Sequence, residues 1–410
     1  MRTARALAVA LVAGLGVGTA VVAPGAAVGA GGERDSVRFA TYNASLNRGA
    51  AGQLVSDLST PGNAQAGAVA EVVQRERPDV LLINEFDYVP GQKAADLFRS
   101  NYLEVGRNGA APIHYPYVYV APSNTGVPSG FDLNNDGRVG GGDDAFGFGV
   151  FEGQYGMVVY SRFPIDTEHV RTFQLFKWKD MPGAMLPDNP ATPAPADWYS
   201  PAELDVFRLS SKSHWDVPIQ IGRRTVHFLV SHPTPPTFDG AEDRNGTRNH
   251  DEIRFWADYI QPSRSSYIYD DKGRYGGLRP GSPFVIAGDQ NSDPVDGDSV
   301  PGAIQQLLDN PRIIDPRPSS AGASEAAVLQ GGANTSHKGD PKYDTADFAD
   351  TAPGNLRVDY VLPSRQLKPV GTGVFWPVQA DPLSRLTGVF PFPTSDHRSV
   401  WLDVRVPGRH

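Results

Sequence analysis

The 410-residue sequence contains no cysteine. Disulfide bonds, thiolate catalysis, cysteine-bound zinc and iron–sulfur clusters are therefore excluded, and the fold has to be stabilised by a large hydrophobic core. Basic residues are also in the minority, because 37 Lys and Arg stand against 46 Asp and Glu, a formal charge of −9. This balance argues against a protein that holds nucleic acid through its overall charge, although a local basic groove is compatible with it.

Long apolar runs are absent beyond the first 30 residues, so no later segment is expected to span a membrane. Arg2 and Arg5 precede an apolar run over residues 6–22, and residues 28–30 offer small side chains for cleavage. This pattern is typical of a secretory signal peptide, so we predict that residues 1–30 are removed and that the protein is secreted. A membrane anchor is the alternative, but the run is short and rich in glycine.

We predict that residues 31–410 form a single domain. Hydrophobic residues make up 40% of the chain, which is enough for a packed core, and 44 Gly with 36 Pro indicate many loops. Helical spacing predicts helices over 64–77 and 249–260. Strands with only a few helices between them indicate an α/β fold of two sheets packed face to face, with helices outside. Runs rich in Val, Ile, Phe and Tyr predict strands at 37–42, 80–83, 117–120, 156–160, 225–230, 283–287, 356–361 and 399–402.

Two long irregular segments interrupt this pattern. Residues 121–155 are rich in Gly and Asp, and residues 181–203 are crowded with Pro and Ala. Strands of the same style continue on both sides, so we interpret both segments as loop insertions in one domain. Long loops without structure of their own tend to be functional or mobile.

Polar residues follow directly after one predicted buried strand, in Gly-Asp289-Gln-Asn291. Residues two apart in an extended chain face the same way, so a carboxylate and an amide would be aimed at one spot. The alternative interpretation is a hydrogen-bonded turn that ends the strand.

A second pattern joins an acid and a histidine from distant segments. Asp359 interrupts the apolar strand over 356–361, where a carboxylate is costly unless it is paired. His397, in Ser-Asp396-His397, is a candidate partner, because a carboxylate would orient the imidazole and raise its basicity. An outward-facing, solvated Asp359 is the alternative.

Three further polar residues end predicted strands: Asn43, Glu85 and His232. Oxygen ligands of this kind suit Mg²⁺ or Mn²⁺ better than zinc. In a chain without cysteine, water activated by such a metal is a natural nucleophile.

The order of these motifs resembles the endonuclease/exonuclease/phosphatase superfamily over about residues 37–404. The most specific segments are Gly-Asp-x-Asn, Arg-Val-Asp-Tyr-Val and Ser-Asp-His, in that order. The resemblance implies a four-layer α/β sandwich, in which two mixed sheets are flanked by helices. It also implies Mg²⁺- or Mn²⁺-dependent cleavage of phosphate esters, with metal-activated water attacking in line. The series is Asn43, Glu85, the strand at 156–164, His232, Asp289, Asn291, Asp359, Asp396 and His397.

The resemblance also assigns roles to these residues. Glu85 would be the principal metal ligand, with Asn43 and Asp396 near it. Asp289 would orient or deprotonate the attacking water, and Asn291 would hydrogen-bond the phosphate. Asp359 would pair with His397, while His397 and His232 would stabilise the non-bridging oxygens or assist the leaving group. Such an arrangement suits phosphoryl transfer, which needs positioning and charge neutralisation more than covalent help.

A second metal-binding pattern lies within the first insertion. The spacing over residues 132–143 fits a calcium-binding loop, with oxygen side chains at positions 1, 3, 5 and 12 and glycine at position 6. No clear helix flanks it, so we predict an isolated Ca²⁺ loop, similar to those of dockerin-type modules; a polar turn is the alternative. The predicted loop site comprises Asp132, Asn134, Asp136, Arg138 and Asp143.

Three functions are weighed from these observations. The first is a secreted, monomeric hydrolase of small or lipid-derived phosphate esters, which the acidic charge favours. A membrane lipid would then be a partner, with Trp178 and Trp198 as candidate contacts, although both residues equally suit buried packing. The second is an extracellular nuclease, and the third is a non-catalytic binding protein on the same fold. Candidate phosphate contacts of a nuclease are Arg223, Arg224, Arg244, Arg248 and Arg254.

Overall fold

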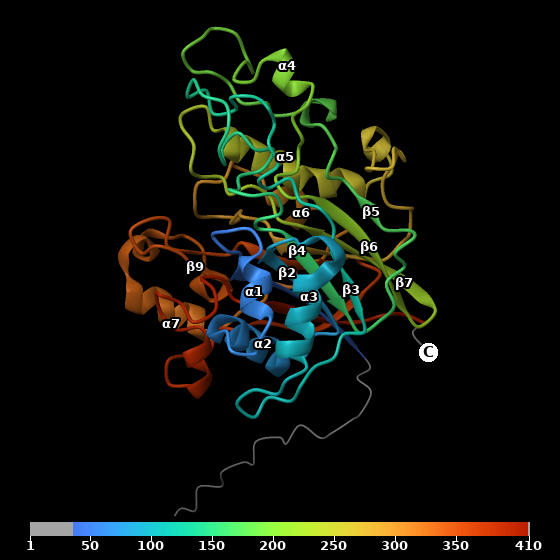
Figure 1. Cartoon of the computed structure of the whole chain (residues 1–410), viewed down its shortest axis with the longest axis vertical. Helices are drawn as coiled ribbons and strands as arrows, with labels where there is room; N and C mark the ends of the chain where they lie inside the picture. The colour runs from blue at the N-terminus through green and yellow to red at the C-terminus, as the bar shows by residue number, and fades with distance from the viewer. Residues whose placement is uncertain (1–35, 409–410) are drawn as a thin grey trace, which may run out of the picture. The chain divides into compact units, whose positions relative to one another are not determined.

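The computed structural model describes residues 36–408, and two β-sheets form its centre (Figure 1). The predicted signal peptide lies outside these residues. The first sheet is mixed, because β1 and β2 are parallel while its other neighbouring strands are antiparallel. Its strands, in spatial order, are β12 (Lys368–Val374), β13 (Val400–Arg405), β1 (Val37–Leu46), β2 (Val80–Phe86), β4 (Met157–Ser161) and β3 (Tyr117–Tyr119).

The second sheet is mixed as well, with β7 and β8 as its parallel pair. A separate two-stranded ladder joins β9 (Ala346–Asp347) to β10 (Asn355–Leu356). The strands of the second sheet, in spatial order, are β11 (Asp359–Pro363), β8 (Phe284–Asp289), β7 (Arg224–Ser231), β6 (His214–Ile221) and β5 (Arg171–Thr172).

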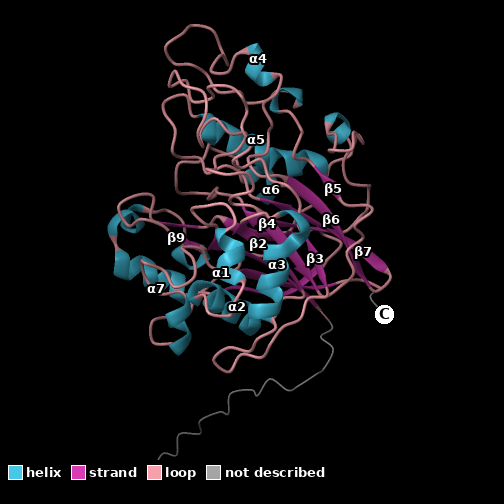
Figure 2. Cartoon of the chain, viewed as in Figure 1, coloured by secondary structure: helices cyan, strands magenta, loops and turns pink. Residues whose placement is uncertain are grey.

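The two sheets pack face to face through one apolar cluster to which both contribute, with the rings of Phe39 and Phe228 5.5 Å apart. Helices cover the outer faces (Figure 2). The first sheet packs against α1 (Gln53–Leu58), α2 (Ala64–Glu76) and α3 (Lys93–Phe98). The second packs against α5 (Arg244–Tyr259) and α6 (Gln305–Leu308). The predicted four-layer α/β sandwich is therefore confirmed.

Shorter helical elements complete the described chain. None of its helices combines the length and the hydropathy needed to cross a bilayer. Two short α-helices are α4 (Pro201–Leu204) and α7 (Ala321–Gln330), one π-helical turn is Arg99–Leu103, and the 3₁₀ turns are Pro90–Gln92, Trp178–Asp180, Ser265–Tyr267, Gly332–Ser336, Pro341–Tyr343 and Pro382–Leu386.

Local sequence explains where α2 lies. The Asn63 side chain accepts a hydrogen bond from the Ala66 N–H and so caps the first turn. The helix ends at Arg77, whose φ of 53° is left-handed, directly before Pro78. The prediction for this helix is confirmed to within one residue.

The sequence pattern did not predict other elements, because their buried polar residues pair with residues distant in the sequence. Strand β6 has the polar residues His214 and Asp216 on its face toward α5, opposite the apolar residues that face the other sheet, and both are buried. Asp216 lies there because it accepts from the Tyr259 hydroxyl at 2.6 Å and lies 2.7 Å from the Nδ1 atom of His227. Helix α5 begins five residues before its predicted start for a similar reason, since polar Arg248 is buried in its first turns.

The first insertion has no helix or strand between Tyr119 and Met157 of the described chain, apart from isolated bridges. It packs on the segment that leads into β6. The Asn124 N–H donates to the Lys212 carbonyl at 2.8 Å, and its side-chain amide donates to the Ser210 carbonyl at 2.7 Å. Gly147 lies so close that a Cβ there would be 1.8 Å from the Ser211 carbonyl oxygen. The insertion is thus fitted against the fold.

Candidate active site

Strand ends from both sheets bring the predicted residues together. Asp289, the last residue of β8, is the register partner of Asp359, the first residue of antiparallel β11. In the other sheet, Asn43 of β1 is the register partner of Asn84 of β2. Neighbouring strands are about 5 Å apart, so register alone sets each pair side by side.

Asp289 is the centre of the group. Its Oδ2 atom accepts a hydrogen bond from the Asn43 amide at 3.1 Å and lies 3.4 Å from His232 Nε2 and 3.6 Å from His397 Nε2. Burial opposes ionisation of this carboxyl group, but the charge of His397 and the hydrogen bonds from His232 and Asn43 outweigh it and hold the pKa of Asp289 below its usual range. The site therefore presents a buried carboxylate in its ionised form.

Asp289 and Asn291 are joined by a turn. The prediction of an extended chain between these two residues is therefore wrong. Its φ of 50° is left-handed, and its backbone N–H donates to Asp289 Oδ1 at 2.8 Å. This is the Asx-type turn that the sequence left open. The side-chain amide is directed at the Pro233 carbonyl, 3.1 Å away. The turn thus fixes one oxygen of Asp289 and leaves the other to the imidazoles.

Asp359 is fully buried, so the solvated alternative is wrong. Its Oδ2 atom lies 2.9 Å from His397 Nδ1 and accepts a hydrogen bond from the Thr345 hydroxyl at 2.8 Å. Burial alone would lower the pKa of His397, but the carboxylates of Asp359 and Asp289 raise it well above its usual value. His397 is therefore a cation held between two acids.

His232 differs from His397 in its charge. Burial, together with the nearby ammonium group of Lys212, lowers the pKa of His232 to about 4. Its Nδ1 atom is buried and has no hydrogen-bond partner in the described chain. The site therefore pairs one neutral and one charged imidazole on the same carboxylate.

Glu85 and Asp396 lie at the edge of the group. Glu85, the residue before the last one of β2, has a left-handed φ of 57° and accepts a hydrogen bond from the Asn43 amide at 3.1 Å. Burial raises the pKa of Glu85, and the charges of Asp396 and Asp289 raise it further. Asp396 accepts from the hydroxyl groups of Ser45 and Ser395, at 3.4 and 3.3 Å. The structure thus brings together all eight predicted catalytic and metal residues.

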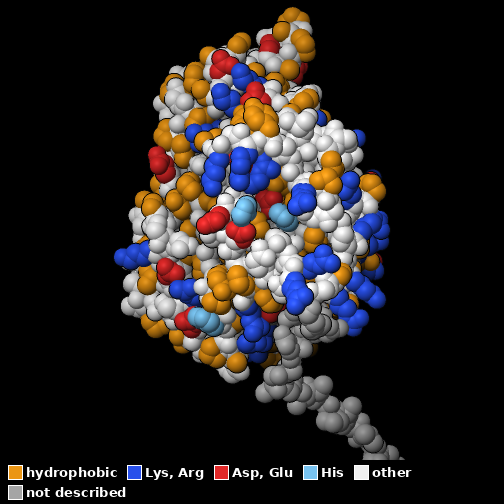
Figure 3. Space-filling view, turned by 90° about the vertical axis from the view of Figure 1, so that its right-hand side faces the viewer, with side chains coloured by type: hydrophobic (Ala, Val, Ile, Leu, Met, Phe, Trp, Pro, Cys, Tyr) orange, Lys and Arg blue, Asp and Glu red, His pale blue; other side chains and the backbone are white. Residues whose placement is uncertain are grey.

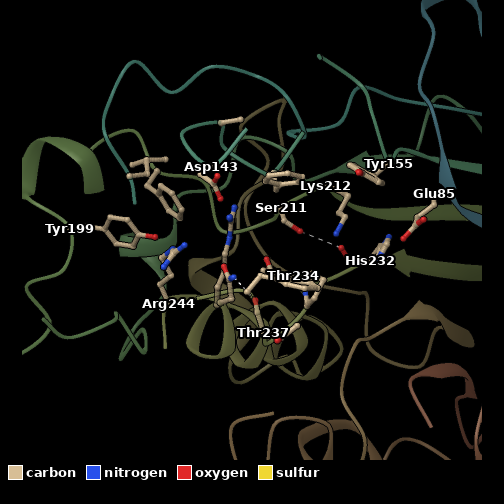
Figure 4. Close-up of a pocket in the computed structure, with 18 residues that line it drawn as sticks. Glu85, Asp143, Tyr155, Tyr199, Ser211, Lys212, His232, Thr234, Thr237 and Arg244 are labelled. Carbon is tan, nitrogen blue, oxygen red and sulfur yellow. Dashed lines mark hydrogen bonds between the residues drawn. The ribbon is translucent and has the colours of Figure 1, made fainter. Parts of the chain in front are cut away.

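Three residues of the site escaped the sequence analysis. Asn84 is buried, and its side-chain oxygen accepts from the Asp289 N–H at 3.2 Å. Thr345 holds Asp359, and the Lys212 ammonium group faces the cavity beside His232 and Glu85 (Figure 4). Asn84 directly precedes Glu85, which is a signal that was available in the sequence. Lys212 and Thr345 lie in loops, where no pattern points to a partner.

The profile described as the Endonuclease/Exonuclease/phosphatase family matches residues 40–397. The chain belongs to this family and is a metal-dependent phosphoric ester hydrolase. No curated protein matches it.

Solved structures with a similar fold include three bacterial proteins. An endonuclease/exonuclease/phosphatase from Beutenbergia cavernae is 17% identical, with a TM-score of 0.48, over 92% of this chain and 73% of that one. Sphingomyelinase C from Streptomyces griseocarneus is 15% identical, with a TM-score of 0.45, over 90% and 99%. A mannosyl-6-phosphatase from Bacteroides thetaiotaomicron is 12% identical, with a TM-score of 0.43, over 90% and 99%. Likeness at this level carries no argument about substrate.

The donor set fits the divalent metal that the family implies. Within residues 36–408, Glu85 and Asp396 form no ion pair with a basic side chain, so their charges are left for a cation. In the same part of the chain, one group of carboxylates and imidazoles has all its ligand atoms within 4.8 Å, namely Asp289, Asp359 and His397. The Asn43 amide N–H group donates to both Glu85 and Asp289, at 3.1 Å each, and so lies between the two acids.

The predicted calcium loop is closed by hydrogen bonds. The Asp132 carboxylate accepts from the Asp136 and Gly137 N–H groups at 3.0 and 2.8 Å, and Asp136 accepts from the Arg138 N–H at 2.9 Å. Asn134 also accepts from the Asp136 N–H, at 3.1 Å.

The far end of this loop differs from the predicted pattern. Asp143 is exposed, whereas Asp144 is buried and accepts from the Leu133 and Gly140 N–H groups, each at 2.7 Å. In this structure Asp144 therefore closes the loop in the place expected for Asp143.

Proposed function

We propose that this protein is a secreted enzyme that hydrolyses a small or lipid-derived phosphate ester by in-line attack of water. One observation carries the proposal: the ionised carboxylate of Asp289 lies between two imidazoles. Its Oδ2 atom is 3.4 Å from His232 Nε2 and 3.6 Å from His397 Nε2. Asp289 orients the water and accepts its proton. A mono- or diester substrate is compatible with this chemistry.

The two imidazoles act on the phosphoryl group in different ways. His397, kept protonated by Asp359, faces the developing charge on the non-bridging oxygens. His232, with its lowered pKa, is a neutral hydrogen-bond donor. Asn291 donates one amide hydrogen to the Pro233 carbonyl and has a second amide hydrogen for the phosphate. Glu85 and Asp396 would hold a Mg²⁺ or Mn²⁺ ion, which would supply charge neutralisation at the phosphate.

The arginines weaken the alternative of a nuclease. The Arg248 guanidinium is buried and donates to the carbonyls of Leu209, Phe146 and Arg208. Arg224 begins β7 while His232 follows its end, about 26 Å away at the usual rise of a strand. On the face drawn in Figure 3, basic side chains form several separate groups with acidic ones and histidine among them. A continuous track for a nucleic acid backbone is missing from this face.

Arg254 and Arg244 are engaged by other groups as well. Arg254 donates to the carbonyls of Pro182 and Gly183, and Arg244 pairs with Glu242. Trp178 is fully buried, which leaves it no role in binding a membrane lipid. We retain nucleic acid and lipid as substrates to be tested.

The test is a substrate panel with Asp289→Asn as the inactive variant. Plasmid DNA, sphingomyelin and an aryl phosphate are assayed with Mg²⁺, Mn²⁺ and Ca²⁺ in turn. We expect turnover of the aryl phosphate or the lipid, and a loss of about 10³-fold or more in kcat for Asp289→Asn in a protein that remains folded. Exposed Asp309→Asn is the matched control. If DNA is the only substrate that is cleaved, and the cleavage is sensitive to salt, the protein is a nuclease. If no substrate is turned over, the alternative of a non-catalytic binding protein is favoured.

Two finer points belong to the same proposal. We propose that the protein is exported as a monomer, which the residues at 1–30 support through their signal-peptide pattern. We also propose that the loop at 132–143 binds Ca²⁺, which its ligand spacing supports. Such an ion would rigidify the insertion beside the site.

A further inference from the structure

Lys212 is a buried cation without a counter-ion. Its side chain belongs to a residue that is 6% exposed, and its ammonium nitrogen has one long contact, 3.5 Å to the Pro233 carbonyl oxygen. Within residues 36–408 it forms no ion pair. Burial lowers the pKa of Lys212, while Glu252, Glu85 and Asp289 act in the opposite direction. An ammonium group in such a place is costly unless an anion joins it.

Two of the three neighbouring carboxylates are occupied by other groups, and the third, Glu85, accepts a hydrogen bond from Asn43 and forms no ion pair with Lys212 within residues 36–408. The two oxygens of Glu252 accept from the backbone N–H groups of Ser211 and Thr234, both at 2.6 Å. Asp289 is surrounded by Asn43 and the imidazoles. The free N–H groups of Lys212 therefore lack a partner in the described protein.

Lys212 lies at one end of an elongated cavity of about 520 Å³ (Figure 4). Glu85 and His232 line the same end, and Tyr199 and Arg244 line the other. The wall includes side chains from both insertions, among them Leu133, Phe148 and Tyr199. Cavities of this volume hold small organic molecules.

The cavity lies on one side of the reacting centre. Glu85, His232 and Lys212 line it, whereas Asp289 does not. In-line displacement places the leaving group opposite the attacking water, which Asp289 holds. The organic group of the ester is therefore directed into the cavity.

We propose that Lys212 binds an oxygen of the substrate's phosphate, and that the cavity holds the ester's organic group. This proposal rests on the proposed function and narrows it to compact phosphate esters with an apolar or aromatic organic part. The walls supply this preference through Phe148, Tyr155 and Phe207. The Asn124 N–H donates to the Lys212 carbonyl and the Glu252 carboxylate accepts from the Ser211 N–H, so the backbone that carries Lys212 is held in place.

The test of Lys212 uses inorganic phosphate as the probe. Lys212→Met keeps the length of the side chain and removes the charge, and exposed Lys368→Met is the matched control. We expect phosphate to raise the melting temperature of the wild type and of the control but not of Lys212→Met. We also expect the inhibition constant of phosphate against aryl phosphate hydrolysis to rise at least about tenfold in Lys212→Met. Phosphate binding that is equal in all three proteins would overturn the proposal.

The cavity is tested with Phe148→Ala, a change at a half-exposed residue that lines it. We expect kcat/KM for naphthyl phosphate to fall several-fold relative to methyl phosphate, with the phosphate inhibition constant unchanged. Phe390→Ala, at an exposed residue outside the cavity, should change neither. Equal losses for both esters would show that the organic group lies elsewhere.

Failure of this inference is distinct from failure of the proposed function. If the wild type hydrolyses these esters and Asp289→Asn does not, but Lys212→Met binds phosphate normally, only the role of Lys212 is wrong. If the wild type hydrolyses no phosphate ester, the proposed function is wrong.

Discussion

His397 lies between two carboxylates, with its Nδ1 atom 2.9 Å from Asp359 Oδ2 and its Nε2 atom 3.6 Å from Asp289 Oδ2. The two acids are register partners on adjacent strands, so the sheet itself sets their spacing. One side of the imidazole is fixed and charged by Asp359, and the other faces the reacting centre. In the proposed function, this relationship makes Asp359 a positioning residue and Asp289 the catalytic one.

Replacing Asp359 tests this division. Asp359→Asn keeps the size of the side chain but removes the charge that raises the pKa of His397. We expect kcat to fall about 10–100-fold, and the loss of activity at alkaline pH to begin at a lower pH, because a less basic imidazole loses its proton earlier. The measurement is a pH–rate profile. An unchanged profile, with the melting temperature intact, would contradict the role of Asp359.

Glu85→Gln separates metal binding from stability. Burial raises the pKa of Glu85, and repulsion by the charges of Asp396 and Asp289 adds to this effect. We expect the variant to need at least about ten times more Mg²⁺ for half-maximal activity, since a ligand charge is lost. In chelator, where no metal relieves the repulsion, its melting temperature should rise by about 1–3 °C. Exposed Glu168→Gln should change neither quantity, and a fall in melting temperature would refute the repulsion.

Glu76 makes stability depend on pH away from the site. Burial raises the pKa of Glu76 from 4.5 to about 7. The neutral acid is therefore favoured in the folded state, and its contribution is fully present below pH 4.5 and lost as pH rises through about 7. The Glu76→Gln side chain cannot ionise. The unfolding free energy of this variant minus that of the wild type should therefore increase by about 3 kcal/mol from pH 4 to pH 8. Denaturant unfolding of both proteins at pH 4 and pH 8 measures these free energies. The same difference between the two proteins at both pH values would contradict the role of Glu76.

Calcium should stabilise the first insertion. Millimolar Ca²⁺ is expected to raise the melting temperature, because binding to the folded state alone shifts the unfolding equilibrium. Asp136→Ala removes one ligand and should abolish the rise, whereas exposed Glu168→Ala, outside the loop, should retain it. The measurement is a melting curve with Ca²⁺ or chelator. Identical melting curves with Ca²⁺ and with chelator would contradict the proposed calcium site.

The fold and most of the site were predictable because their signals are local. Apolar runs such as 80–83 and 283–287 predict strands by themselves, and Glu85 and Asp289 stand where those strands end. Strand β6 was missed because its buried polar residues are compensated by partners distant in sequence, Tyr259 and His227. The turn at Asn291 also depends on a hydrogen bond that the spacing of residues did not decide.

The order and type of the motifs in the sequence determined the family, the layered fold and the candidate acids and imidazoles of the site, because each is encoded by side-chain chemistry at a strand end. Only the tertiary structure decided which imidazole is charged, since that depends on how many carboxylates surround it. It also decided that Lys212, from an unremarkable loop, is buried beside His232 without a counter-ion. Burial and pairing arise from contacts between distant segments, which a linear pattern does not contain.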